Sequence, residues 1–198
     1  MTVSVSCGFF PDERARAAAL FWQAFSGKLS RVMGPDARGL AFFERVLNPG
    51  FALVARDADG RMLGLAGYKT CDGGLTQGRL ADLARVYGWF GALWRGLVLS
   101  VLERDLKPGV FQMDGICVAA EARGQGVGTL LLRAIKDEAQ RLGMHEVHLD
   151  VINTNPSART LYEREGFQAI GQDYTGPFKH LFGFSSATKM RWVVTDGG

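Results

Sequence analysis

The chain has 198 residues, of which 47% are hydrophobic and 22% are charged. These proportions are ordinary for a globular protein with a buried core, and the length predicts one domain over residues 1–198. The net charge is only +3 and no Lys/Arg cluster is interleaved with aromatic residues, so the sequence argues against nucleic acid binding.

Three cysteines are present, Cys7, Cys71 and Cys117, and their spacing matches no metal-binding motif. An odd number without such spacing argues against a disulfide framework and against a zinc site, so no metal is expected. No secretory leader is recognised before the first expected strand, and the sequence therefore predicts a cytoplasmic protein.

The first quarter of the chain predicts a strand and two helices. A strand is expected over residues 2–8, and a helix begins at Pro11, because proline and acidic residues favour a first helical turn. A loop is expected over residues 27–34. A second helix is expected over residues 35–47, where Asn-Pro-Gly ends it.

A hairpin and a helical segment follow. Residues 51–56 and 62–69 are expected to be strands, joined by a turn that ends at Gly60. The next forty residues, 70–109, exceed an ordinary connection. Apolar residues recur there at steps of three and four, which indicates a helical seam. Glycines inside it predict a kink or a two-helix hairpin. The seam comprises Leu80, Leu83, Tyr87, Phe90, Trp94, Leu97 and Val101.

A glycine-rich loop follows a strand expected over residues 110–118 and opens directly into a helix. Gly124, Gly126 and Gly128 remove side chains where a helix presents unpaired N–H groups and its positive dipole end, which favours phosphate binding. Arg123 adds a charge. Neither the P-loop nor the dinucleotide motif fits this spacing. The apolar stripe expected for the helix is Val127, Leu130, Leu131, Ala134, Ile135, Ala139 and Leu142, with a C-cap at Gly143.

The pattern Arg-x-x-Gly-x-Gly at Arg123, Gly126 and Gly128 resembles the acetyl-CoA loop of the GCN5-related N-acetyltransferase (GNAT) superfamily. A second block comes after a strand expected over residues 146–152. It resembles the superfamily segment N-x-x-A-x-x-L-Y-x-x-x-G-F, matched at Asn155, Ala158, Leu161, Tyr162, Gly166 and Phe167. Two motifs in the right order are more specific than either alone, and the resemblance covers residues 110–170.

The resemblance implies an α/β GNAT fold, with a mixed, mostly antiparallel sheet that splays between its two central strands and is flanked by helices. Those strands are residues 110–118 and 146–152, and further strands are expected at 167–173 and 188–194. Acetyl-CoA would lie in the gap as cosubstrate. The cofactor-binding residues that the resemblance implies are Ile116, Cys117, Val118, Arg123, Gly124, Gln125, Gly126, Val127, Gly128, Thr129, Asn155 and Tyr162.

Acetyl transfer requires a held thioester, a deprotonated amine and a proton for the leaving thiolate. Tyr162 stands where the family usually carries its thiolate-protonating tyrosine; packing against the sheet is the alternative. Asp114 is the first candidate for the base, and a structural carboxylate at a bulge beside Gly115 is the alternative. Some family members place glutamate where this chain has Gln112 and Val110, which leaves the identity of the base open.

Four further side chains in this region are open to more than one interpretation. Asn155 suits a helix N-cap, with Pro156 at the first helical position, and bonding to the pantetheine arm would be additional. A solvated strand face explains His148 and Asp150. Cys117 invites a covalent acetyl-cysteine, but no histidine lies in sequence reach, so direct transfer is favoured.

The sequence therefore predicts an N-acetyltransferase that moves an acetyl group from acetyl-CoA to a primary amine in a ternary complex. The acceptor is expected to be a small-molecule or peptide amine. Two alternatives stay open: an enzyme that uses a longer acyl-CoA, and a non-catalytic CoA-sensing or interaction module. The aromatic residues of the first two helices, Phe21, Phe25, Phe42 and Phe43, are expected either to line the acceptor pocket or to pack in the core.

Residues 70–109 form an insertion, since the family usually joins these strands by a short turn. The apolar run 89–102 is too short to span a bilayer and carries Arg95. A membrane-surface helix is a weaker alternative, and membrane contact is not expected. The insertion is expected to cover the acceptor site or to pack against a second subunit as a homodimer. The aromatic stretch 174–184 is expected to reach over the acceptor pocket.

Overall fold

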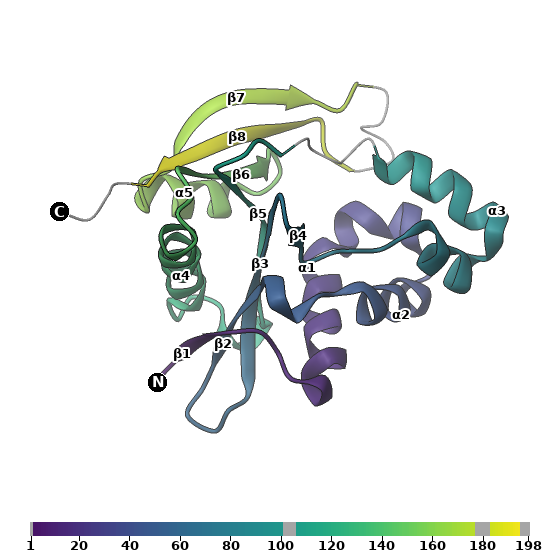
Figure 1. Cartoon of the computed structure of the whole chain (residues 1–198), viewed down its shortest axis with the longest axis horizontal. Helices are drawn as coiled ribbons and strands as arrows, with labels where there is room; N and C mark the ends of the chain where they lie inside the picture. The colour runs from purple at the N-terminus through teal and green to yellow at the C-terminus, as the bar shows by residue number, and fades with distance from the viewer. Residues whose placement is uncertain (1, 101–105, 177–182, 195–198) are drawn as a thin grey trace.

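In the computed structural model, which describes residues 2–100, 106–176 and 183–194, eight strands form one sheet (Figure 1). The order is β1-β2-β3-β5-β6-β8-β7, with β4 paired to β3. The strands are β1 Ser4–Cys7, β2 Ala52–Arg56, β3 Met62–Thr70, β4 Gly73–Gly74, β5 Val110–Val118, β6 Glu146–Ile152, β7 Gln168–Tyr174 and β8 Ser186–Val193. Strands β5 and β6 are parallel, and the other pairs are antiparallel.

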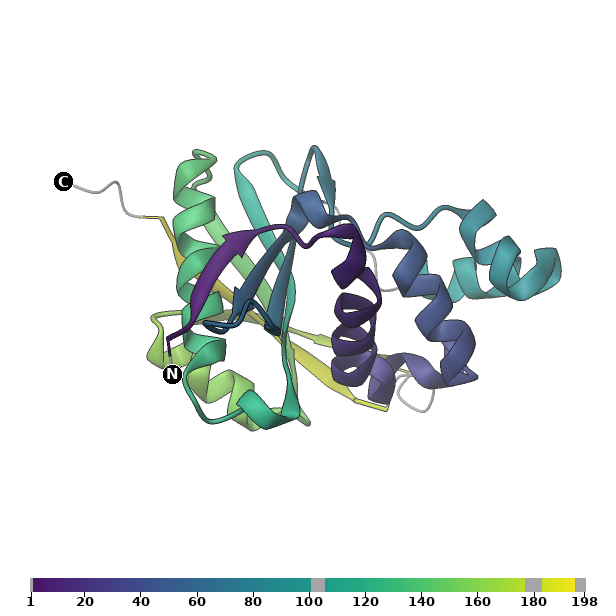
Figure 2. The ribbon, with the colours of Figure 1, turned by 90° about the horizontal axis from the view of Figure 1, so that it is seen from below.

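Helices cover both faces of this sheet. The α-helices are α1 Arg14–Met33, α2 Asp36–Val46, α3 Leu80–Ser100, α4 Val127–Arg141 and α5 Pro156–Arg164, and the 3-10 turns are η1 Pro11–Glu13, η2 Pro49–Phe51 and η3 Ala120–Ala122. Helices α1 and α2 lie on one side of the central strands and α4 on the other (Figure 2). The layered α/β architecture expected from the sequence is confirmed.

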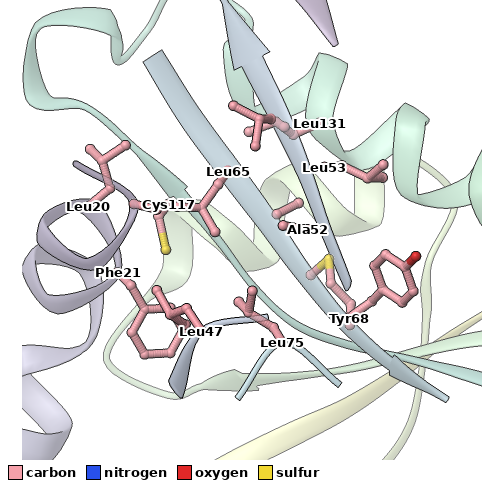
Figure 3. Packing of buried hydrophobic residues seen from close by; sticks show 14 of the residues in the cluster. Leu20, Phe21, Leu47, Ala52, Leu53, Leu65, Tyr68, Leu75, Cys117 and Leu131 are labelled. Atoms are coloured by element: carbon pink, nitrogen blue, oxygen red, sulfur yellow. The ribbon is translucent and has the colours of Figure 1, made fainter. Parts of the chain in front are cut away.

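The core continues through the sheet because both of its faces are covered. Every residue of β2 except the last is buried, as expected for a strand that packs against helices on both sides. On one face Cys117 and Leu65 lie near Leu20 and Phe21 of α1 (Figure 3). On the other face Leu131 of α4 is fully buried.

The two central strands separate after three residue pairs. Strand β5 pairs with β6 only from Val110 to Gln112. On its other edge β5 pairs with β3, where Tyr68 aligns with Met113 and Gly67 with Gly115, so Asp114 is one extra residue. This is a β-bulge, which bends its strand and increases the local twist. The splayed sheet and the bulge at Asp114–Gly115 are both confirmed.

The prediction of a loop over residues 27–34 is wrong, because helix α1 continues to Met33. Its last turn is held by tertiary contacts that no local pattern reveals. Val32 and Met33 are fully buried, and the two side chains Tyr87 and Arg95 of α3 donate hydrogen bonds to their backbone carbonyls. The helix therefore persists across Gly27, which lowers helix propensity.

The kink expected in the insertion is confirmed at Gly88, whose φ of 71° and ψ of 165° interrupt α3. The helical segment is also confirmed, but its apolar seam does not face one side of the chain's own core. Leu83 and Tyr87 are buried before the kink, but beyond it Phe90, Trp94 and Leu97 are exposed. The left-handed glycine turns the second half of the helix, so that Ala92 faces the body instead.

The remaining elements follow their local signals closely. Strand β6 has the expected bounds, Asn155 caps α5 through its side-chain oxygen, and Gly143 follows α4 with a φ of +66°. One residue of the expected stripe on α4 is wrong: Leu130 is 38% exposed, and Leu132 is buried in its place. The stripe on α4 is therefore rotated toward Leu132.

Candidate active site

A cavity of about 480 Å³ lies where β5 and β6 separate. It receives residues from α1 on one side, from α5 on the other, and from both strands between them. The lining residues are Gln23, Ala24, Phe25, Gly27, Met113, Asp114, Gly115, Ile116, Val118, Arg123, Asp150, Val151, Ile152, Thr154, Asn155, Ser157, Ala158, Tyr162 and Gly183. The gap between the strands is therefore bordered by α1 and α5.

Asp114 enters the cavity from the bulge on β5. Its Oδ2 atom is buried and has no hydrogen-bond partner among the described residues. Burial raises the pKa of this carboxyl to about 6, although the nearby Lys69 acts to lower it. A carboxylate with this pKa changes charge close to neutral pH, as a general base for an amine must.

Tyr162 lines the cavity from helix α5. The cap at Asn155, whose Oδ1 accepts from the Ala158 N–H at 3.2 Å, fixes the start of this short helix. The Tyr162 side chain is 7% exposed and its ring lies 6.1 Å from that of Phe167. Burial, and then the proximity of Cys117, raise the pKa of the Tyr162 phenol to about 12, so the phenol is neutral at physiological pH.

Strand β5 borders the cavity with backbone groups as well as side chains. Because its pairing with β6 ends at Gln112, the edge from Met113 onward borders the cavity instead of a neighbouring strand. Ile116 and Val118 line the cavity there, whereas Cys117 points its side chain into the core and is 1% exposed (Figure 3). Any role of Cys117 toward a ligand would therefore use its backbone.

The glycine loop lies next to the cavity at Arg123. Gly124 and Gly126 have φ angles of +74° and +82°, and Gly126 is the N-cap of α4. A side chain at either position would meet no atom within 4 Å, so the backbone there is open to solvent. The first helical bond runs from Leu130 N to Gly126 O, and the three preceding amides form the free first turn.

Residues 124–129 do not line the cavity itself, whereas Arg123 does. Arg123 donates from Nε to the Val118 carbonyl at 3.2 Å, which ties the loop to the end of β5. Gln125 donates to the Glu121 carbonyl, and Thr129 accepts from Arg164. The loop therefore extends the cavity outward instead of forming its floor.

Helix α1 supplies a wall that the sequence indicated only through its phenylalanines. Phe25 lines the cavity and covers Gly115 so closely that a Cβ there would lie 2.4 Å from the ring. Phe21, Phe42 and Phe43 instead pack in the core, where Phe43 contacts both other rings. The three lining residues Gln23, Ala24 and Gly27 were missed, since no motif marks them.

Asp150 also lines the cavity, although its strand position suggested an ordinary solvated face. It lies on β6 beyond the last residue paired with β5, so it faces the gap between the strands. Its alternation with His148 and Ile152 was the available signal. Most of the stretch 174–184 lies outside the described residues, but Gly183 lines the cavity and approaches the Gly27 carbonyl.

Within residues 2–100, 106–176 and 183–194, no three His, Cys, Asp or Glu side chains lie together as metal ligands would. No helix in the same ranges has the length and apolar character needed to cross a bilayer.

Comparison with known proteins places this geometry in a family. The family model described as "Acetyltransferase (GNAT) family" matches residues 15–167. The rat protein named N-acetyltransferase 8F1 is 29% identical over 115 residues, which cover 52% of each chain. The chain spans between 22% and 53% of the length of the curated relatives it matches.

Solved structures show the same fold at low identity. An N-acetyltransferase from Staphylococcus aureus matches with a TM-score of 0.69 and 16% identity, covering 96% of this chain and all of the other. A phosphinothricin acetyltransferase from Sinorhizobium meliloti, solved in complex with AcCoA, matches with a TM-score of 0.63 and 17% identity. That match covers 100% of this chain and 91% of the other.

Proposed function

Since the chain belongs to the acetyltransferase (GNAT) family, we propose that it transfers the acetyl group of acetyl-CoA directly to a primary amine. The observation that carries the proposal is the cavity between the parted strands β5 and β6. Asp114 and Tyr162, which come from different elements, both line this cavity. The acceptor we infer is a small-molecule or peptide amine.

The residues around the cavity fit acetyl-CoA as a cosubstrate. The unpaired edge of β5 at Ile116, Cys117 and Val118 offers backbone groups to the amide groups of the pantetheine arm. The open turn at Gly124 and Gly126, with the first-turn amides of α4, suits a diphosphate. Arg123 supplies a positive charge at the junction of the two.

Asp114 and Tyr162 divide the proton transfers in this proposal. The ammonium of the acceptor loses one proton to Asp114, which releases it to solvent. The free amine then forms the N–C bond to the thioester carbonyl, and the C–S bond breaks. Tyr162 donates to the departing sulfur, and the second nitrogen proton restores the phenol. The products are an amide, a CoA thiol and one released proton.

The raised pKa of Tyr162 determines how the phenol takes part in this step. At about 12 it lies above the pKa of a thiol, which is about 8.5 in a model compound. The phenol is therefore a hydrogen-bond donor that stabilises the developing thiolate, and complete proton transfer to sulfur is coupled to the loss of the nitrogen proton. A donor of this kind accelerates the step without being indispensable.

A thiol-release assay with a panel of amines tests the proposal. The wild-type chain should release free CoA from acetyl-CoA with at least one amine. Tyr162→Phe should lower kcat about 10- to 100-fold, because it removes the donor to sulfur and keeps the ring. Tyr174→Phe, at an exposed tyrosine outside the cavity, is the matched control.

Calorimetry separates the alternatives. Heat on titration of acetyl-CoA without turnover on any amine would identify a CoA-binding module and refute catalysis. Faster release from a longer acyl-CoA than from acetyl-CoA would replace the proposed acyl group. Absence of heat for both CoA and acetyl-CoA would refute the proposed use of the cavity.

A further inference from the structure

The second half of α3 exposes a continuous apolar face. Trp89, Phe90, Leu93, Trp94 and Leu97 recur on one side of the helix beyond the kink at Gly88. Phe90 is 92% exposed and Leu97 is 73% exposed. These five residues and Leu80 together are called the α3 face.

The opposite side of the same half-helix is also apolar and is already occupied. Ala92 is fully buried, and Val98 and Leu99 pack against the core. A helix that is apolar all round is normally buried on every side. The chain itself therefore covers only half of this surface.

The α3 face is large for the surface of a monomer. At about 200 Å² for each large side chain, its six residues expose on the order of 700 Å² together. The largest apolar patch on a typical monomer measures roughly 300–600 Å². A stable dimer of standard size buries roughly 800 Å² per partner. The exposed area therefore approaches what one half of such an interface requires.

The charges around the α3 face suit a protein surface better than a lipid surface. A helix that lies on a membrane carries a polar side rich in Lys and Arg. Over residues 86–100 Arg95 is the one charged residue, and it turns toward the body, where Nε donates to the Val32 carbonyl at 2.7 Å.

At the edge of the face, Arg85 lies 3.9 Å from Asp82, which also pairs with Arg45. A neutral, aromatic centre with paired charges at its rim is the usual anatomy of a protein interface.

The position of α3 allows a second copy of the chain to reach it. Both views place α3 at one end of the molecule, beyond α1 and α2 (Figures 1 and 2). Two such ends can meet about a twofold axis without collision between the two sheets, and a helix face that packs on itself needs no other partner. We propose that the α3 face is the interface of a homodimer.

Sedimentation equilibrium of the full chain over a range of concentrations tests this interface. The wild type should behave as a dimer. The double variant Phe90→Glu/Leu97→Glu should raise the dissociation constant on the order of 100-fold or more, since it buries unpaired carboxylates at the centre. Ile170→Glu, at an exposed apolar residue of β7, is the matched control and should leave the dimer intact. Thermal melts verify that each variant is folded.

A milder variant covers the case in which the double variant does not fold. Leu93→Ser adds no charge and should still weaken the dimer by about tenfold. A monomeric wild type would overturn the proposal, as would a dimer that resists both sets of changes. Sedimentation of the wild type with phosphatidylserine vesicles, lost in the double variant, would also overturn it and assign the α3 face to lipid. The proposed acetyl transfer is tested separately, so either result can fail alone.

Discussion

Asp114 is the residue on which the proposed chemistry depends most, and its environment predicts a distinctive variant. Asp114→Asn should lower kcat by about 10²- to 10⁴-fold, because an amide accepts no proton. In the wild type, activity should fall as the pH drops through about 6, where the carboxyl becomes protonated. The variant should lack this acidic limb. The measurement is kcat against pH for both proteins.

The stability of Asp114→Asn distinguishes the loss of a base from damage to the structure. Its folded-state pKa of about 6 lies above the ordinary value, so the folded chain binds the proton more tightly than the unfolded chain does. Stability from this group therefore falls as the pH rises from about 4 to 6. Asp114→Asn should then be at least as stable as the wild type above pH 6. A destabilised variant would instead indicate a structural carboxylate at the bulge.

At the scale of elements, α3 holds the end of α1, and α1 forms one wall of the cavity. Arg95 donates to the Val32 carbonyl and places its guanidinium 4.0 Å from the centre of the Tyr87 ring. Arg95→Ala should cost about 1–3 kcal/mol in the free energy of unfolding, since it leaves a carbonyl at the helix end without its donor. Denaturant titration at one protein concentration measures this.

Arg85→Ala is the matched control for that prediction. Its side chain is largely exposed and lies 3.9 Å from Asp82, so its removal should change stability by less than about 0.5 kcal/mol. If both variants unfolded at the same denaturant concentration, the contacts of Arg95 would not support α1.

At the scale of the whole molecule, acetyl-CoA would join the two halves of a split sheet. β5 and the glycine loop lie on one side of the gap, and β6 and α5 lie on the other. A ligand at 100 times its dissociation constant adds about 2.7 kcal/mol to stability. This should raise the Tm by about 5–10 °C in a chain of this size.

A thermal shift assay with saturating acetyl-CoA measures the effect, and NADH serves as the control ligand that should give none. Arg123→Ala should reduce the shift. An unchanged Tm with acetyl-CoA would contradict binding across the gap.

The sequence by itself determined the features that neighbouring residues specify. Glycines at Gly124, Gly126 and Gly143 adopt the left-handed backbone that only glycine favours, and Asn155 caps the helix that it precedes. Strand β6 kept its expected bounds because its alternation is local. The two motifs around them were enough to indicate the family, and the second motif contains Tyr162.

Only the tertiary structure decided which surfaces meet. It extended α1 through Met33, brought Gln23 and Asp150 to the same cavity as Asp114, and exposed Phe90 in place of burying it. Each of these outcomes depends on contacts between segments far apart in the chain, or on the one glycine that turns α3. The local periodicity indicates which face of an element is apolar. The packing of distant segments determines which partner, if any, covers that face.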